Sequence, residues 1–240
     1  MSEPGATRAD CPPAGPETMV CETMVCDRCE IRELALFADL TRADLGPNPH
    51  IQDLQLPAGA LLYRADDPGA AIYTVREGLL KLEQYLPDGT QRIVSLLGPG
   101  QVAGLEAMVA GAYEHSAVAL QPTRVCRLPI GIVARLSAKL HRQLMKKWHE
   151  AVLKAHACTR ELATGSARQR VARLFLMLTP PGASQCRLFG REDIGALLEV
   201  TTETASRMVA EFKRSGVIRE TAANSFDYDP EIMRRIAAEN

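Results

Sequence analysis

The sequence predicts an α+β protein in which a domain of short β-strands is followed by a long helix and a C-terminal winged helix-turn-helix. Short apolar runs separated by glycine-containing turns occupy residues 50–128, which is typical of β-strands. An uninterrupted helical pattern follows Pro129, and two short amphipathic helices with a tight connection lie between Arg191 and Ile218. With 240 residues and 46% hydrophobic content, the chain can bury the core of one large or two small domains.

Residues 1–30 combine several prolines with small and acidic residues and show neither strand nor helix periodicity, so we expect a flexible segment. Within it the unit ETMVC occurs twice, in ETMVCETMVCDRCE, which places Cys21, Cys26 and Cys29 within nine residues. The chain shows no apolar run long enough to span a membrane and no secretory signal pattern, so we expect a cytoplasmic protein without a membrane partner. Cytoplasmic thiols stay reduced, which favours metal binding or redox chemistry over disulfides.

Residues 31–128 are predicted to form an all-β domain. Runs such as ALLYR, AIYTV and RIVSLL alternate with turn sequences such as DDPG, PDG and GPG. Glycines recur roughly every ten residues, the spacing of short antiparallel strands in a sandwich or barrel. They stand at positions 59, 69, 78, 89, 100 and 111.

Residues 129–164 are predicted to form a long dimerisation helix. Its apolar side chains alternate steps of three and four residues, which gives a seam suited to pairing two helices in a homodimer. The alternative is that this stripe packs against its own domain. The seam consists of Met145, Trp148, Val152, Ala155, Thr159 and Leu162.

Residues 165–240 are predicted to form a second domain with a helix-turn-helix. Gly165 breaks the long helix, and Ser166 with Gln169 makes a capping box that starts the next one. Further on, Ile194, Leu198 and Val200 and then Ala205, Met208 and Phe212 have the spacing of a helix-turn-helix. Thr201 or Thr202 is placed to cap its second helix, and RETAANSFDY after Ile218 reads as a two-stranded wing.

The start of the second helix is predicted to contact double-stranded DNA. Arginine can donate two hydrogen bonds to guanine, and glutamate can accept one from cytosine N4, so an acidic residue here is explained by base reading. Nine basic residues against five acidic ones between Arg168 and Arg219 agree with a duplex-binding surface, although any amphipathic helix pair can mimic the motif. The predicted DNA-binding residues are Thr202, Glu203, Ser206, Arg207 and Lys213.

From about residue 26 onward the chain resembles the CRP/FNR family of bacterial transcription regulators. The resemblance is carried by REDIGALLEVTTETASRMVAEFKRSGVI, by ARQRVARLFLML before it and by the glycine-punctuated strands. It implies a cyclic-nucleotide-binding-type β-roll, a dimer, RNA polymerase as a partner and, from the E-x-x-S-R motif, a TTGAT-type palindrome as the DNA site. One departure is Glu199, where the family usually carries glycine. We expect no enzymatic activity, because the residues show no paired acid and base, activated nucleophile or phosphate cradle.

The resemblance also bears on the signal. Family members that bind cyclic AMP carry a Gly-Glu pair and an Arg-Ser pair, which here read Gly104-Leu105 and His115-Ser116, with Glu106 one place out of register. The arginine that neutralises the phosphate is missing, so we do not expect cyclic AMP as the effector.

The FNR branch implies an oxygen-labile [4Fe–4S] cluster held by cysteines. Cys26 and Cys29 match its N-terminal pair and Cys126 its roll cysteine, but the usual third N-terminal ligand falls on Ala35. We expect Cys21 to replace it, with Cys11 as a more distant reserve. The alternatives are zinc, a thiol redox switch, or no metal, with nitric oxide sensed through haem or with another effector. Cys158 and Cys186 are expected to be structural, and His156 is a weak candidate for a haem ligand.

Overall fold

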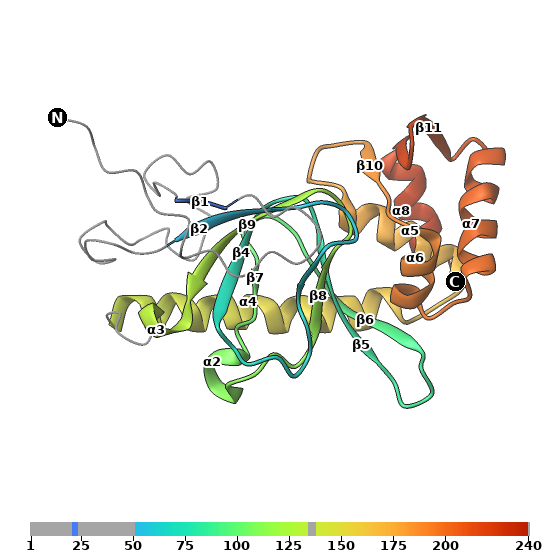
Figure 1. Cartoon of the computed structure of the whole chain (residues 1–240). Helices are drawn as coiled ribbons and strands as arrows, with labels where there is room; N and C mark the ends of the chain where they lie inside the picture. The colour runs from blue at the N-terminus through green and yellow to red at the C-terminus, as the bar shows by residue number, and fades with distance from the viewer. Residues whose placement is uncertain (1–20, 24–50, 134–137, 240) are drawn as a thin grey trace. The chain divides into compact units, whose positions relative to one another are not determined.

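The structure is a computed structural model that describes residues 21–23, 51–133 and 138–239 (Figure 1). The chain divides into two compact units. Unit 1 contains Met1–Leu80 and Leu97–Lys147, and unit 2 contains Lys81–Leu96 and Trp148–Asn240. The α+β class predicted from the sequence is confirmed, with strands throughout residues 51–129 and mainly helices in the described residues after Pro129.

Unit 1 is built on a five-stranded antiparallel sheet with the order β1-β2-β9-β4-β7. Side chains on one face of this sheet, including Leu54, Val75 and Val125, are fully buried and form the centre of the core. The strands are β1 (Cys21–Thr23), β2 (Gln52–Leu56), β9 (Thr123–Pro129), β4 (Ala71–Glu77) and β7 (Val102–Ala103).

A second sheet has the order β3-β8-β5-β6, with β3 at Leu61–Tyr63, β8 at Ser116–Ala119, β5 at Leu80–Tyr85 and β6 at Gln91–Leu97. Strand β5 passes from unit 1 to unit 2 between Leu80 and Lys81, so the hairpin that it forms with β6 groups with unit 2. The short helix α2 (Ala107–Ala110) lies between β7 and β8 in the chain.

The turns fall where the glycines predict them. Five of the six regularly spaced glycines take positive φ angles between 77° and 86°. Gly78, between β4 and β5, shows why the residue matters: a Cβ there would lie 2.4 Å from the carbonyl oxygen of Pro122. No other residue fits this turn, because both the left-handed backbone and the close approach exclude a side chain. The five are Gly59, Gly78, Gly89, Gly100 and Gly111.

The long helix predicted after Pro129 is present as α4 (Ala138–Leu162), preceded by the short helix α3 (Ile130–Val133). Along α4, Met145, Trp148 and Val152 are 69%, 38% and 39% exposed, so this part of the predicted seam is open to a partner. Ala155 is half-buried and Thr159 is exposed. Leu162, the last residue of α4, is only 1% exposed within its own chain, which agrees with the alternative that this end of the stripe packs against its own domain.

The helices of unit 2 pack around Phe175, whose ring lies 6.4 Å from Phe212, 6.0 Å from Phe226 and 5.6 Å from Tyr228. Ser166 begins α5 with the predicted capping box to Gln169. The helices are α5 (Ala167–Leu178), α6 (Arg191–Leu198), α7 (Thr202–Arg214) and α8 (Pro230–Ala238), and the sheet has the order β10-β12-β11. Its strands are β10 (Gln185–Arg187), β11 (Ile218–Ala222) and β12 (Ser225–Tyr228), so the predicted wing is present as β11 and β12.

The division into 1–30, 31–128, 129–164 and 165–240 stays a prediction. Residues 1–20 and 24–50 lie outside the described part of the chain. Within the segment expected to be flexible, Cys21–Thr23 forms β1 and pairs with the edge of β2, whose open hydrogen-bonding groups accept a further strand.

Candidate DNA-binding surface and sensor residues

Helices α6 and α7 form a helix-turn-helix whose turn depends on two residues. Glu199 ends α6 in the left-handed conformation (φ 55°, ψ 44°), a geometry that a non-glycine residue adopts at a cost. Gly195 faces the turn so closely that a Cβ would lie 2.8 Å from the carbonyl oxygen of Val200, while the Val200 amide donates to the Gly195 carbonyl (3.1 Å). The predicted cap is Thr201, whose hydroxyl accepts a hydrogen bond from the amide of Thr204 (3.2 Å).

The residues predicted to read bases lie together on the exposed face of α7. Thr202, Glu203, Ser206 and Arg207 are all exposed, whereas Ala205 and Val209 of the same helix are buried. Hydrogen bonds from its own backbone amide and from Thr201 lower the pKa of Glu203, so this side chain is an anion that can accept a hydrogen bond. Within the described residues, Arg207 makes no ion pair or hydrogen bond, which leaves its guanidinium available to a ligand.

Several basic residues counted toward the DNA surface have partners within unit 2. Arg170 donates to the carbonyl oxygen of Leu198 (2.7 Å), and Arg219 pairs with Asp227 (3.0 Å). Lys213, a predicted DNA contact, pairs with Glu220 of the wing and is exposed. Burial lowers the pKa of Arg191, and its guanidinium donates to a backbone carbonyl oxygen. The excess of basic residues therefore overstates the charge that unit 2 presents to a duplex.

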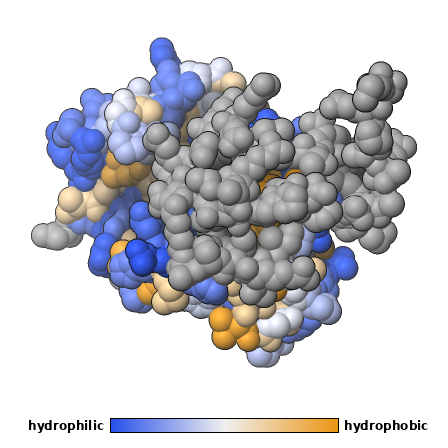
Figure 2. Space-filling view, turned by 90° about the vertical axis from the view of Figure 1, so that its left-hand side faces the viewer, coloured by the Kyte–Doolittle hydropathy of each residue, from blue (hydrophilic) through white to orange (hydrophobic). Residues whose placement is uncertain are grey.

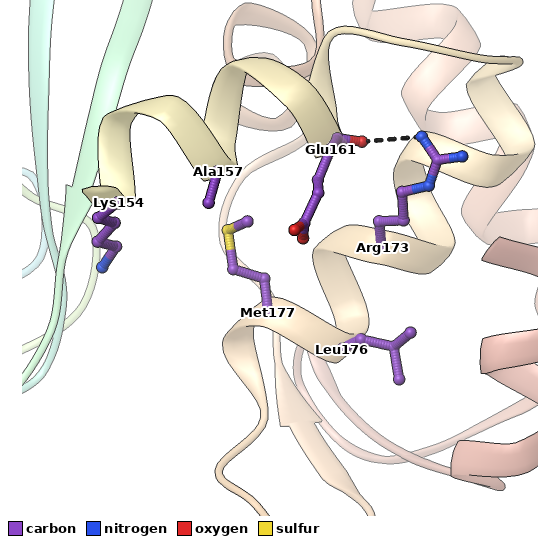
Figure 3. A pocket seen from close by; sticks show the side chains of 6 residues that line it. All are labelled: Lys154, Ala157, Glu161, Arg173, Leu176 and Met177. Atoms are coloured by element: carbon purple, nitrogen blue, oxygen red, sulfur yellow. Dashed lines mark hydrogen bonds between the residues drawn. The ribbon is translucent and has the colours of Figure 1, made fainter. Parts of the chain in front are cut away.

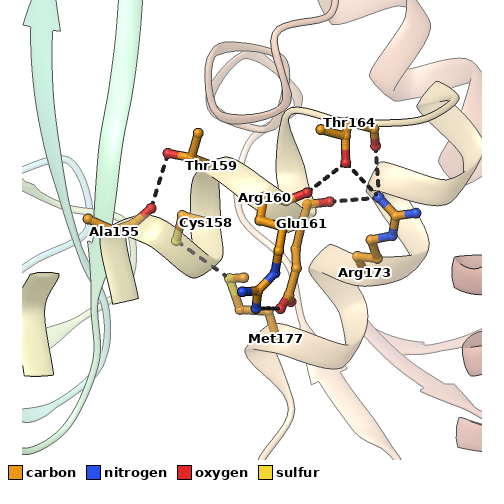
Figure 4. A network of polar contacts seen from close by, with 8 residues as sticks. All are labelled: Ala155, Cys158, Thr159, Arg160, Glu161, Thr164, Arg173 and Met177. Carbon is orange, nitrogen blue, oxygen red and sulfur yellow. Dashed lines mark hydrogen bonds and ion pairs between the residues drawn. The ribbon is translucent and has the colours of Figure 1, made fainter. Parts of the chain in front are cut away.

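Arg173 ties the end of α4 to the helices of unit 2. Its guanidinium donates to the carbonyl oxygens of Glu161 (3.1 Å) at the end of α4 and of Thr164 (2.8 Å) in the following loop (Figure 4). It also donates to the carbonyl oxygen of Ala237 (3.0 Å) in α8. In the same region the Sγ atom of Cys158 lies 3.9 Å from Sδ of Met177. We call this set of contacts the elbow.

Beside the elbow, unit 2 contains a pocket of about 340 Å³ between α4 and α5 (Figure 3). Apolar side chains, among them Leu176 and Met177, contribute most of its wall. Lys154 also lines it, and burial lowers the pKa of this lysine. Burial raises the pKa of the nearby Cys158 thiol and, to about 12, that of Cys186, so both cysteines have the inert character expected of structural residues.

The stretch that resembles a cyclic-nucleotide site is filled with aromatic rings. Tyr113 packs against Gly104, where a Cβ would lie 2.9 Å from its ring, and its hydroxyl donates to the carbonyl oxygen of Ala71 (2.8 Å). Its ring stacks on Tyr63 with centroids 3.8 Å apart. Glu106, the displaced glutamate, has its pKa raised by burial.

Cys126 is the one predicted cluster ligand whose surroundings the structure describes. It is buried in β9, opposite Asp53 on β2 and Thr74 on β4. Asp53 in turn pairs with Arg76 (2.8 Å) and Arg124 (2.5 Å), so two cations and one anion lie on the strands next to this thiol.

The N-terminal cysteines are only partly described. Cys21 lies in β1 opposite Leu54, one row of the ladder away from the row that contains Cys126. Cys26, Cys29, Cys11 and Ala35 lie outside the described residues. Among the described residues, no group of three or more His, Cys, Asp or Glu side chains is arranged to hold a metal ion. The cluster therefore stays a prediction. His149 and His156, the latter proposed for haem, are exposed on α4.

Sequence reasoning missed three functional features of unit 2. The first is the requirement for glycine at position 195, where the carbonyl oxygen of Val200 leaves no room for a Cβ; only the folded turn shows this contact. Arg173 was counted as surface charge, but it bonds to backbone carbonyls. The third feature is a set of ion pairs between the β5–β6 hairpin and α6, formed by residues 112 positions apart in the chain.

No helix in the described ranges is long and apolar enough to cross a membrane. On the face of the molecule drawn in Figure 2, the described residues are mainly hydrophilic, with small separate hydrophobic areas.

The chain is similar to known proteins in both units. The cyclic nucleotide-binding domain family matches residues 53–139, and the Crp-like helix-turn-helix domain family matches residues 169–227. Transcriptional regulatory protein btr of Bordetella pertussis is 31% identical over 176 residues, which cover 69% of this chain and 73% of that protein. Transcriptional activator protein anr of Pseudomonas aeruginosa is 30% identical over 205 residues, which cover 80% of this chain and 84% of that protein.

Among solved structures, FixK2 from Bradyrhizobium japonicum superposes with a TM-score of 0.70. The superposition covers 79% of this chain and 98% of that one. At 23% sequence identity, this likeness shows the fold alone.

Proposed function

Because the chain belongs to the CRP/FNR family of transcription regulators, we propose that it binds, as a homodimer, a palindrome of two TTGAT-type half-sites. The observation that carries this proposal is the exposed group of Glu203, Ser206 and Arg207 in the N-terminal half of α7. In helix-turn-helix proteins these positions of the second helix meet base edges in the major groove. Its relatives are regulators, and the chain is not an enzyme.

A TTGAT half-site contains a single G·C pair, and α7 carries a matching donor and acceptor. Arg207 can donate two hydrogen bonds to the guanine, and the anionic Glu203 can accept one from cytosine N4. Ser206 lies beside Arg207 with a hydroxyl that can both donate and accept. Thr202 and Lys213 lie at the two ends of α7, where contacts to the phosphate backbone would fix the register of the helix.

Replacing Arg207 with alanine tests this assignment. We expect Arg207→Ala to lose about 1–3 kcal/mol of discrimination between the palindrome and a scrambled duplex, measured by fluorescence anisotropy at fixed salt. Arg214→Ala is the matched control, because Arg214 is also exposed on α7 but at its C-terminal end. The control should weaken binding to both duplexes alike. Equal losses on both duplexes for Arg207→Ala would make it a phosphate contact and remove the base-reading role.

The exposed stripe of Met145, Trp148 and Val152 supports pairing through α4. Large apolar side chains at steps of three and four along one helix are the pattern of a two-stranded helix pair. A dimer would present two copies of α7 to the two half-sites, and its contact with RNA polymerase at the promoter would convert DNA occupancy into regulation. Val152→Glu should shift the protein toward monomer in light-scattering chromatography. An unchanged dimer would place the interface elsewhere.

For the signal, we propose a [4Fe–4S] cluster held by Cys21, Cys26, Cys29 and Cys126. The surroundings of Cys126 fit such a group: the thiol forms no disulfide, and positive charge comes from Arg124 on the same strand and from Arg76 on the neighbouring β4. Positive charge favours the thiolate form that iron requires. A one-residue shift of β1 would bring Cys21 into the row of Cys126. When bound, the cluster would supply an oxygen-sensitive cross-link between the N-terminal segment and the roll.

Anaerobic purification, with an iron and sulfide assay and an absorption spectrum before and after air exposure, tests the cluster. About four irons and four sulfides per chain, with colour that bleaches in air, would support it. Cys126→Ser should then lose the colour, whereas Cys186→Ser should keep it. A colourless protein that still binds the palindrome would favour an effector other than the cluster. A haem spectrum would favour nitric oxide sensing.

A further inference from the structure

The β5–β6 hairpin is joined to helix α6 by an ion-pair cluster inside unit 2. Nζ of Lys81 lies 2.6 Å from Oδ1 of Asp193 and 2.6 Å from Oε2 of Glu83. Gln91 on β6 donates to the same Glu83 oxygen (2.5 Å). The side chains of Lys81 and Glu83 are only 9% and 8% exposed. This is a built polar site shielded from solvent, unlike the exposed ion pairs elsewhere in unit 2.

A second contact lies at the other end of α6. Asp193 stands in the first turn of this helix, and Glu199 is its left-handed terminal residue. Arg92 of β6 lies 3.9 Å from Oε1 of Glu199. The hairpin therefore meets α6 at its beginning and its end, so both the position and the direction of the helix are restrained.

The chemistry of the cluster makes it sensitive to the loss of one partner. Burial on its own would lower the pKa of Lys81, but the hydrogen bonds that its amine donates to Asp193 and Glu83 outweigh burial, so the pKa is raised and the amine is charged. The carboxylates of Asp193 and Glu83 both lie within hydrogen-bonding distance of the Lys81 amine. Without that cation the two negative charges would face each other. Partly buried like charges repel strongly, so the hairpin and α6 would separate.

The hairpin also connects the two units along the chain. Its strands leave unit 1 between Leu80 and Lys81 and return between Leu96 and Leu97, and α4 makes the other connection between Lys147 and Trp148. Helix α6 packs directly on α7, the helix that carries the proposed base-reading residues. An attachment of the hairpin to α6 therefore links α6 and α7 to the strands of the hairpin, in addition to the link along α4.

We propose that Lys81 is a positioning residue for DNA binding: by joining the β5–β6 hairpin to Asp193, it holds α6 and α7 in the orientation that lets a dimer engage two half-sites together. The proposal rests on the proposed function. A palindrome is bound tightly only if both recognition helices have the right separation, about one helical turn of DNA. A single half-site makes no such demand. Loss of the Lys81 ion pairs should therefore weaken binding to the palindrome and leave binding to a half-site unchanged.

The test compares Lys81→Met, Asp193→Asn and the double variant with the wild-type protein on two duplexes, a TTGAT palindrome and a single TTGAT half-site. We expect Lys81→Met to weaken palindrome binding by roughly 5- to 150-fold, the usual range for coupling between sites, and to leave half-site binding unchanged. The double variant should lose no more affinity for the palindrome than Lys81→Met does, because Asp193→Asn removes one of the two repelling carboxylates. The charge reversal Lys81→Asp with Asp193→Lys should restore part of the affinity.

Arg234→Met is the matched control, because Arg234 forms an exposed ion pair with Glu231 on α8 and has no part in the cluster. It should bind both duplexes like the wild-type protein. Equal losses on palindrome and half-site for Lys81→Met would indicate damage to the helix-turn-helix itself and overturn the proposal. So would unchanged palindrome binding by Lys81→Met, or additive effects in the double variant. If the wild-type protein binds neither duplex above scrambled DNA, the proposed function fails instead.

Discussion

Substituting Gly195 with alanine tests the geometry of the helix-turn-helix most directly. Gly195 lies inside α6, where alanine is a better helix former than glycine by about 1 kcal/mol. Propensity alone therefore predicts that Gly195→Ala stabilises the protein. The structure predicts the opposite, because the new Cβ would lie 2.8 Å from the carbonyl oxygen of Val200 and 3.4 Å from the amide nitrogen of Thr202.

The clash outweighs the propensity gain because the atoms that it involves cannot move independently. The clashing atoms belong to the backbone of Val200 and Thr202 in the turn. Two hydrogen bonds fix this turn: the Val200 amide donates to the Gly195 carbonyl, and the Thr201 side chain caps α7. Forcing an extra methyl group into a packed site costs about 1–3 kcal/mol. Subtracting the propensity gain leaves a net destabilisation of up to about 2 kcal/mol. The turn would have to open, so α7 would change its angle to α6.

Two assays separate these effects. Thermal unfolding should show a lower melting temperature, by about 2–4 °C for each kcal/mol in a chain of this size. Binding to the palindrome should weaken more than the stability loss explains, since the folded fraction still carries a displaced α7. Gly131→Ala is the matched control, because Gly131 lies in helix α3 with no atom within 4 Å of its added Cβ. If Gly195→Ala proved as stable as this control and bound DNA normally, the steric argument would be refuted.

For three further substitutions the structure predicts the direction of the change in stability. Glu199→Gly should stabilise the protein by up to about 1 kcal/mol in urea unfolding, because glycine adopts the left-handed conformation freely; a loss would mean that the Arg92 contact matters more. Arg173→Met should lower the free energy of unfolding by about 2 kcal/mol, since it leaves the carbonyl oxygens of Glu161 and Ala237 without their charged donor. An unchanged melting temperature would show that these hydrogen bonds do not stabilise the elbow. Burial raises the pKa of Glu106, so its contribution to stability is present at low pH and is lost as pH rises through the folded-state pKa. Glu106→Gln should therefore gain stability relative to wild type as pH rises above the usual carboxyl pKa of about 4, and a difference in melting temperature that stays constant with pH would reject this.

Local patterns in the sequence were enough to predict most of the fold. The capping box at Ser166 and Gln169 and the Thr201 cap both depend on residues within three or four positions of each other, and both are confirmed. The face of α7 could be predicted for the same reason: a helix fixes which of its residues share a side. Whether a seam residue faces a partner or its own domain could not be decided in this way: Leu162 is buried within its own chain, whereas Met145 is exposed.

Contacts between distant residues could not be predicted in this way. Lys81 and Asp193 are polar residues in ordinary strand and helix positions, and nothing in either neighbourhood indicates the other. Arg173 looked like surface charge because a sequence does not show that carbonyl oxygens surround a side chain. The stacking of Tyr63 on Tyr113 was equally hidden, because the two rings belong to residues far apart in the chain.

The elbow and the hairpin cluster differ in how a signal can act through them. Arg173 bonds to backbone carbonyls of α4 and α8, which no change in side-chain charge can release, so α5 must follow any movement at the end of α4. The Lys81 cluster depends on three side chains and can be broken by a displacement of the hairpin alone. Because the side chains of Lys81 and Glu83 are largely shielded, dissolved salt should screen their pairing weakly. On the proposed role of Lys81, a displacement of β5 and β6 would release α6, while the elbow keeps α5 and α8 attached to the end of α4.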